Sequence, residues 1–133
     1  MNTFDHDIMI TNSDLQRLLP VIEQSDTPAS EALEMELHRA VIVDPEQVPT
    51  DLVTMNSELV YEDVDTQTRR RVTLVYPKDA DASRGRISVL APIGSALLGL
   101  RVGQEIDWQT PSGPKRIRVV EVHYQPEANG NPR

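Results

Sequence analysis

The residue types that could do chemistry occur here in incomplete motifs. Gly94 and Gly99 have the spacing of a phosphate-binding loop, but Leu100 and Arg101 occupy the positions where such a loop requires lysine and then serine or threonine. Because the neighbouring side chains are mostly apolar, the glycines indicate packing instead. The sequence therefore predicts no nucleotide-binding loop in this segment.

The residues that could bind a metal lack the required spacing as well. Asp79–Ser83 begins like a calcium loop, yet Arg84 replaces the glycine that its sharp turn needs. His6, His38 and His123 are scattered along the chain, and there is no cysteine. No serine–histidine–acid set and no glycosidase-like pair of carboxylates can be recognised. We therefore expect no metal, no cofactor and no enzymatic activity.

The distribution of charge is the most informative bulk property. The 133-residue chain has a net charge of −8. Residues 1–52 contain eleven acidic and two basic side chains, whereas residues 53–133 contain ten acidic and eleven basic ones. Binding to nucleic acid relies on Lys and Arg that neutralise phosphates, so this balance disfavours strong direct nucleic-acid binding and favours a protein partner with a basic surface. The basic run Arg69–Arg71 is interpreted as a solvated strand edge, with a contact to an acidic partner or to nucleic acid as the alternative.

The length suits one medium domain, or a small domain with an appendage. No stretch approaches the roughly 20 apolar residues of a membrane helix, and the first residues lack the apolar run of a signal peptide. Together with the absence of cysteine, this predicts a soluble cytoplasmic protein with no membrane partner.

Two short helices are predicted before residue 44. The first has an apolar face at helical spacing: Leu15, Leu18, Leu19 and Ile22. Thr11 or Ser13 can cap it, and Pro20 predicts a kink or an early end. Thr27 caps the second helix, with Pro28 at the favoured first position. Because the link is so short, the pair should form an antiparallel hairpin about 20 Å long.

From Val53 onward the apolar period changes from that of a helix to that of a strand. Strands are predicted near residues 57–64, 69–76, 86–90, 105–109 and 115–124, with one short helix at 94–100. A break in the last alternation predicts a β-bulge near Val119 or burial of both faces. Trp108 is expected to be buried against the short helix.

These elements define an α+β fold with two parts. A helical hairpin at 1–44 is followed by a Pro-rich linker at 45–52, an antiparallel-rich sheet domain at 53–125, and a tail at 126–133.

A resemblance to one protein family rests on several segments. Residues 91–103 read APIGSALLGLRVG and resemble the signature of the C-terminal domain of the bacterial Gre transcript-cleavage factors. Three further segments follow the same family in order and spacing: residues 61–66, 73–81 and 122–124. Three short stretches are closer to a shorter relative in that family, the regulator of nucleoside diphosphate kinase: VTMNS at 53–57, LVYP at 74–77 and IDW at 106–108.

The resemblance implies a fold and a partner. In the Gre family, the C-terminal domain has an FKBP-like fold and binds RNA polymerase at the rim of its secondary channel, while a long N-terminal coiled coil brings acidic residues to the catalytic magnesium. For this chain, the resemblance implies a polymerase-docking segment: Leu90, Ala91, Pro92, Ile93, Gly94, Ser95 and Leu97. Leu97 would equally suit the core. With one Phe and one Trp, the chain cannot line the aromatic pocket of a prolyl isomerase.

The N-terminal part departs from the family. Its predicted hairpin is much shorter than the Gre coiled coil, and the acidic residues at its tip, Asp26 and Glu31, also suit cap and first-turn positions. We therefore expect that the tip does not reach the polymerase metal. The leading hypothesis is a transcription regulator that binds RNA polymerase and competes with Gre-type factors without stimulating cleavage. The alternatives are regulation of nucleoside diphosphate kinase, by direct contact or through its expression, and stimulation of transcript cleavage.

Overall fold

The computed structural model describes residues 8–25, 27–110 and 113–125, without the side chains of Ala29 and residues 108–110. The N-terminal elements are β1 (Met9–Thr11), α1 (Asn12–Glu23), α2 (Pro28–His38) and β2 (Val41–Val43). The remaining strands and helix are β3 (Glu58–Asp63), β4 (Thr68–Val75), β5 (Arg86–Ser88), α3 (Pro92–Leu97), β6 (Glu105–Thr110) and β7 (Gly113–Tyr124). Three 3₁₀ turns join them: η2 (Pro45–Gln47), η3 (Pro77–Asp79) and η4 (Ala82–Arg84). The fold is mixed α+β, as the periodicity predicts.

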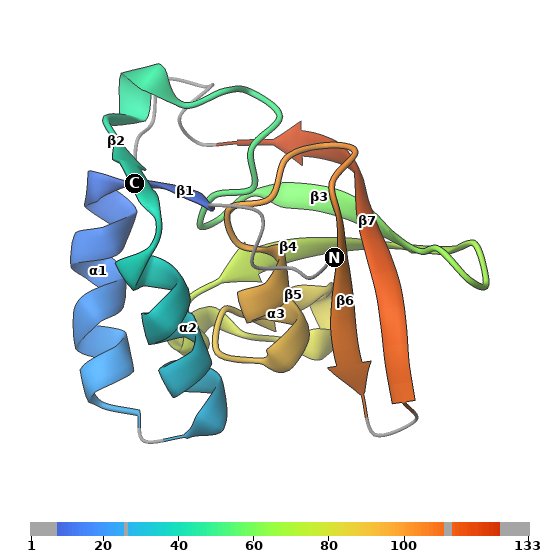
Figure 1. Ribbon diagram of the computed structural model, residues 1–133, viewed down its shortest axis with the longest axis horizontal. Helices are drawn as coiled ribbons and strands as arrows, with labels where there is room; N and C mark the ends of the chain where they lie inside the picture. Colours follow the sequence, from blue (N-terminus) through green and yellow to red (C-terminus); the bar gives the residue numbers. More distant parts are fainter. Residues whose placement is uncertain (1–7, 26, 111–112, 126–133) are drawn as a thin grey trace.

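Helices α1 and α2 lie side by side and are joined at one end by a short link (Figure 1). The Thr11 hydroxyl accepts the N–H of Asp14 at 3.0 Å, and the Thr27 hydroxyl accepts the N–H of Ser30 at 3.1 Å, so both predicted N-caps are confirmed. A kink or an early end was predicted at Pro20; helix α1 continues through Pro20 to Glu23, so the early end is wrong. The buried residues Leu18 and Ile22 flank the proline, and their packing outweighs its missing N–H. No helix within the described ranges is long and apolar enough to cross a membrane.

Strand β1 precedes the helix pair in the sequence and β2 follows it. The two strands pair with each other and form a two-stranded parallel sheet. Met9 lies opposite Val41, and Thr11 lies opposite Val43. The sequence predicts an irregular or extended arm at residues 1–10 and gives no signal for this pairing. Three residues are too few to show a period, and the partner strand is about 30 residues away in the chain.

The other five strands form one sheet in the order β5-β4-β3-β7-β6, in which only the β4–β5 pairing is parallel. The register between β3 and β7 shifts between Val60 and Tyr61, which leaves Val120 as an extra residue in β7. The predicted bulge near Val119 is therefore confirmed. It allows Ile117 and Val119 on one side of the bulge, and Val122 on the other, all to contribute to the core.

Helix α3 differs from its predicted bounds of 94–100. It begins at Pro92, because proline suits the first turn of a helix and needs no hydrogen-bond acceptor there. It ends at Leu97, before Gly99, whose φ of +83° lies in the left-handed region. The preceding strand was predicted to reach residue 90. It ends at Ser88, where the turn that leads into α3 begins.

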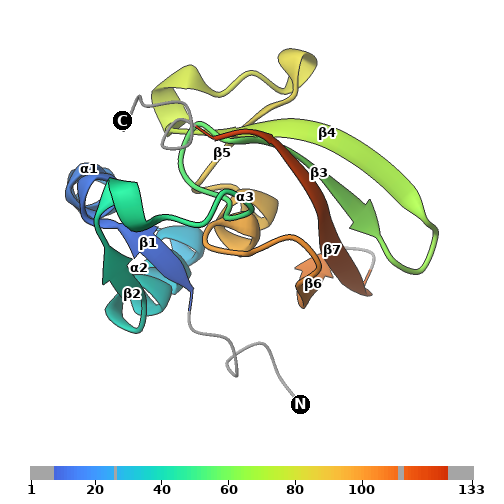
Figure 2. The same ribbon diagram turned by 90° about the horizontal axis from the view of Figure 1, so that it is seen from above.

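One hydrophobic cluster joins the N-terminal and C-terminal elements. It includes Leu18 and Leu33 of the helix pair, Leu59 of the sheet, and Leu97 of α3. Seen from above, the curved sheet wraps around α3, with the helix pair beside it (Figure 2). The prediction that Trp108 is buried concerns a side chain outside the described part.

Candidate docking surface

The predicted docking residues, Leu90–Ser95 and Leu97, lie in the segment Leu90–Leu97, which runs from the end of β5 into α3. This segment is called the docking segment after that prediction. Ser88 closes the turn at the start of the segment: its hydroxyl accepts the N–H of Leu90 at 3.0 Å, and its carbonyl accepts the N–H of Ala91 at 3.0 Å. Ala91 has an extended backbone, and Pro92 follows as the first helical residue. These contacts give the turn a defined shape.

Gly94 fixes the position of α3 against the strand before it. A β-carbon built on Gly94 would lie 2.0 Å from the carbonyl oxygen of Ser88 and 3.1 Å from the α-carbon of Val89. Both neighbours are backbone atoms and cannot turn aside. A glycine is therefore required here by close approach of the backbone, although the residue has an ordinary helical conformation.

The docking segment divides into a buried and an accessible part. Leu97 is fully buried, and Gly94 is buried against β5, so both belong to the framework of the segment. Pro92 is exposed, while Ala91 and Ile93 are half-buried. The other predicted members, Leu90 and Ser95, are also half-buried, and the Ser95 hydroxyl donates to the carbonyl of Pro92 at 3.1 Å. These five accessible residues form a small, mostly apolar projection, which is called the knob.

A groove of about 560 Å³ lies beside this knob, between α2, α3 and β6. Ser95 and Ala96 line one wall, and Met35 of α2 lines the other with 69% of its surface exposed. Met35 is not among the functional residues predicted from the sequence. One signal in the sequence could have indicated Met35. It lies three residues after Ala32, on the same side of α2 and outside the apolar stripe that Leu33 and Leu37 form.

The helix pair is fixed to the rest of the molecule by a buried carboxylate as well as by apolar packing. Asp14 is fully buried, and its Oδ2 accepts the N–H of Met55 at 3.1 Å, across 41 residues of sequence. Leu18 and Leu33 are fully buried nearby in the same core. The helix pair is thus packed along the body of the protein instead of standing alone.

The predicted acidic tip of the helix pair is described only in part. Asp26 lies outside the described residues. Glu31 is exposed in the first turn of α2, just after the capping box of Thr27 and Ser30. An acidic residue in that turn favours the helix through its dipole, so its position has a local structural explanation. The structure therefore places Glu31 on a different element from the docking segment.

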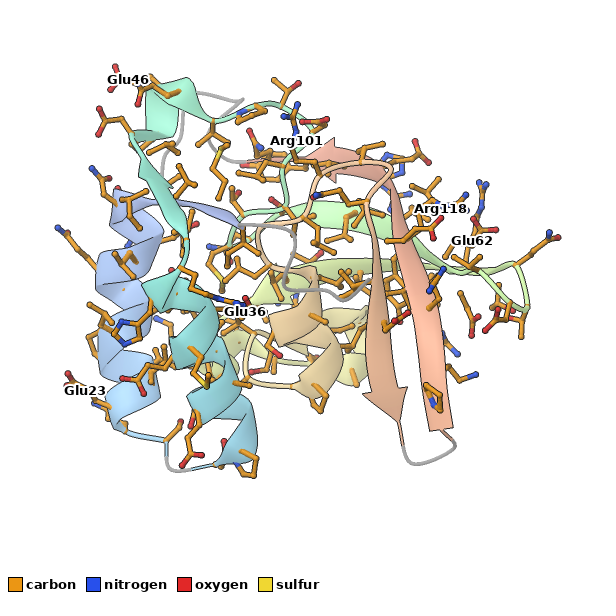
Figure 3. All side chains as sticks on the ribbon, viewed as in Figure 1. Glu23, Glu36, Glu46, Glu62, Arg101 and Arg118 are labelled. Atoms are coloured by element: carbon orange, nitrogen blue, oxygen red, sulfur yellow. The ribbon has the colours of Figure 1, made fainter. Side chains whose placement is uncertain are left out.

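Acidic side chains of the N-terminal part are spread over several elements. Glu23, Glu36 and Glu46 lie on α1, α2 and η2 and point in different directions (Figure 3). Among the described residues, no three histidine, aspartate or glutamate side chains gather as a metal site would require. The negative charge of this region is therefore diffuse.

Charges on the sheet are interleaved, with each sign facing the other. Arg118 lies 2.8 Å from Glu105 and 3.7 Å from Glu62, beside which it appears in Figure 3. Arg116 lies 3.1 Å from Asp107 on the neighbouring strand. Such partly exposed pairs stabilise a fold only slightly, and they leave this face close to neutral.

Two described groups with shifted pKa values lie at the β3–β4 hairpin. Desolvation raises the pKa of Tyr61, and Arg70 partly opposes this effect. Desolvation would also raise the pKa of Asp63, but hydrogen bonds from the N–H of Thr66 and from Lys115 outweigh it and lower that pKa. Neither group belongs to the docking segment.

Family models match the chain in two consecutive parts. Residues 48–124 match the model described as transcription elongation factor GreA/GreB, C-term, and residues 6–43 match the Rnk N-terminus model. The docking segment lies within the first of these matches.

Individual relatives agree with the family models. Over 128 residues, the chain is 42% identical to the regulator of nucleoside diphosphate kinase of Escherichia coli (strain K12), which covers 93% of this chain and 94% of the relative. Over 92 residues, it is 38% identical to the transcription elongation factor GreA of Chlorobium phaeobacteroides (strain BS1), which covers 68% of this chain and 58% of that GreA.

A solved structure extends the agreement to three dimensions. A prokaryotic transcription elongation factor GreA/GreB from Nitrosomonas europaea superposes with a TM-score of 0.76 at 48% sequence identity, covering 90% of this chain and 99% of that chain. The chain therefore belongs to the GreA/GreB transcription elongation factor family, together with the short relatives called regulators of nucleoside diphosphate kinase.

Proposed function

We propose that this protein is a transcription regulator that binds RNA polymerase at the rim of the secondary channel and competes there with Gre-type factors. Docking uses the C-terminal part, residues 53–125, which we describe as FKBP-like by analogy with the family. The observation that supports this most is the exposure of Pro92, with Ala91 and Ile93 half-buried beside it, within the segment that matches the GreA/GreB C-terminal model. Packing of the core does not require an apolar residue at that exposed position.

The rigidity of the docking segment supports the same proposal. The Ser88 hydrogen bonds and the close approach at Gly94 hold the knob in one conformation before any partner binds. A preorganised surface loses little conformational entropy on association, so a small apolar contact can give useful affinity.

We further propose that the protein does not stimulate transcript cleavage. Helix α1 has 12 residues, which corresponds to a length of about 18 Å. The helix pair shares the hydrophobic core through Leu18 and Leu33 and cannot project as a long coiled coil. Residues 1–44 would therefore act by occupying space at the channel entrance, and residues 45–52 would serve as the connection.

A second candidate function follows from the name of the Escherichia coli relative, a regulator of nucleoside diphosphate kinase. Under this alternative, the protein contacts that kinase directly or changes its expression. The two functions differ in the partner that the purified chain retains, so both partners belong in the same experiment.

The test measures binding of the purified chain to RNA polymerase and, separately, to nucleoside diphosphate kinase, followed by competition with GreA and a transcript-cleavage assay. We expect binding to polymerase that GreA displaces, without stimulated cleavage. Retention of the kinase alone would favour the second function. Stimulated cleavage would contradict the non-enzymatic part of the proposal.

A further inference from the structure

A second cavity of about 860 Å³ lies between α1, the Asn56 turn, η3 and the end of β7. No residue of the docking segment lines it, and polymerase docking gives it no role. Its volume lies within the range of roughly 300–1,000 Å³ that is typical of small-molecule sites in proteins. The chemistry of its lining therefore decides what it could bind.

Two cations from distant parts of the sequence line this cavity. Arg17 comes from α1, and Lys78 comes from η3. Residues 8–52 contain one other basic side chain, Arg39, which forms an ion pair with Glu36 at 2.9 Å. Neither Arg17 nor Lys78 forms an ion pair with any described residue. One carboxylate, Asp79, also lines the cavity, so its charged lining residues leave a net positive charge. In a chain of net charge −8, this favours an anionic ligand.

Two aromatic rings line the same cavity. Tyr76 is half-buried and packs against the hydrophobic core, so its ring has a fixed position. Tyr124 is 40% exposed. The β3–β7 register places Tyr124 opposite Glu58 and Val122 opposite Leu59, so this second irregularity in β7 turns Tyr124 away from the buried face. A planar ligand group can stack on an exposed tyrosine ring.

Asn56 adds a polar group that can both donate and accept hydrogen bonds. Its φ is +66°, in the left-handed region, and its N–H donates to the carbonyl of Leu74 at 2.6 Å. The adjacent hydroxyls of Thr54 and Ser57 lie 2.9 Å apart and brace this turn. Asn56 lines the cavity, and its side chain forms no hydrogen bond with a described residue. Its amide therefore remains available to a ligand.

We propose that this cavity binds a mononucleotide. The phosphates lie at Arg17 and Lys78, the base stacks on a tyrosine ring, and Asn56 pairs with a polar edge of the base or the ribose. This combination accounts for the cations, the aromatic rings and the free amide together, whereas phosphate alone would leave the rings unused. The proposal is independent of the polymerase-docking function.

Isothermal titration of the full chain with GDP, ADP, guanosine and inorganic phosphate tests this directly. We expect a nucleoside diphosphate to bind, and guanosine and phosphate to bind at least about tenfold more weakly, because each makes only part of the contacts. Absence of binding by both diphosphates up to about 1 mM would overturn the proposal. Equal binding of guanosine or of phosphate alone would overturn it too.

Variants locate the binding and separate it from a general effect of charge. Arg17→Gln and Lys78→Gln should each weaken diphosphate binding roughly tenfold, and Tyr124→Leu about fivefold or more. Arg69→Gln is the matched control: it removes an exposed arginine without a described ion pair, near the β3–β4 turn that projects away from α1 (Figure 1). It should leave binding unchanged. An equal loss in Arg69→Gln would overturn the assignment to this cavity, and thermal melting checks that every variant is folded.

Discussion

The docking segment and the helix pair are both short, yet different forces hold them in place. The docking segment is fixed by backbone contacts, with Gly94 against Ser88, and it leaves Pro92 exposed. The helix pair is fixed by side chains, with Leu33 in the core and the buried carboxylate of Asp14 on the N–H of Met55. The two regions therefore differ in which residues remain free to act.

This difference changes how candidate functional residues should be judged. Glu31 belongs to the residue types most often associated with chemistry, but it lies in a helix first turn after a capping box, where it has a structural role. Pro92 and Ile93 have no chemistry of their own, and Pro92 also suits the first turn of α3. Unlike Glu31, however, Pro92 lies beside other accessible apolar residues, Ala91 and Ile93. We therefore propose that the accessible apolar residues of the docking segment, and not the acidic residue of the helix pair, contact the partner.

The largest expected effects test whether the two regions share one core. Leu97→Ala in the docking segment and Leu33→Ala in the helix pair each truncate a fully buried side chain. Each should lower the free energy of unfolding by roughly 2–5 kcal/mol. Urea denaturation followed by far-UV circular dichroism should give one cooperative transition in both variants. Two separated transitions would show that the regions unfold independently.

A smaller effect tests the backbone contact of the docking segment. Gly94→Ala places a β-carbon against the Ser88 carbonyl, so the helix must shift, and the free energy of unfolding should fall by about 1–3 kcal/mol. Gly103→Ala is a useful comparison, because a β-carbon there meets no atom within 4 Å and only the positive φ is disfavoured. Equal stability of Gly94→Ala and the natural protein would refute the proposed close fit.

A comparable effect tests the anchor of the helix pair. Asp14→Ala removes the acceptor of the Met55 N–H and leaves that buried donor without its carboxylate. The free energy of unfolding should fall by roughly 1–3 kcal/mol. Amide hydrogen exchange should become faster at Met55, while the docking segment keeps its protection. Unchanged exchange at Met55 would argue against the anchor.

The smallest effect concerns the acidic tip. Glu31→Gln removes one exposed charge near a helix N-terminus and should lower stability by at most about 1 kcal/mol. Competition with GreA should remain, and added salt should weaken it only through loss of electrostatic steering. Transcript cleavage stimulated by the natural protein and lost in Glu31→Gln would mean that the helix pair acts chemically.

Much of the fold follows from local signals in the sequence. Thr11, Thr27 and Pro28 mark helix starts because caps and first-turn prolines satisfy or avoid unpaired N–H groups next to them in the chain. The faulty alternation at Val119 reveals the bulge because side chains on a strand must alternate faces. These features depend on neighbours only a few residues apart.

Features that depend on distant partners were missed or misplaced. The β1–β2 pairing joins segments about 30 residues apart, and three-residue strands have no readable period. The short helix was predicted at 94–100, whereas α3 runs from Pro92 to Leu97 and packs through Gly94 on the backbone of Ser88. The spacing of Met35 places it outside the apolar stripe of α2, but its position beside the groove depends on how α2 packs in the folded protein.

The central claim is that the exposed apolar knob of the docking segment, and not the helix pair, determines polymerase binding. The most direct measurement is the affinity for RNA polymerase of the double variant Pro92→Glu, Ile93→Glu, compared with that of Leu19→Glu, which changes an exposed leucine of α1 in the same way. The account predicts a loss of about a hundredfold or more in the double variant and little change in Leu19→Glu, with both proteins folded by thermal melting. Unchanged affinity in the double variant, or an equal loss in Leu19→Glu, would contradict it.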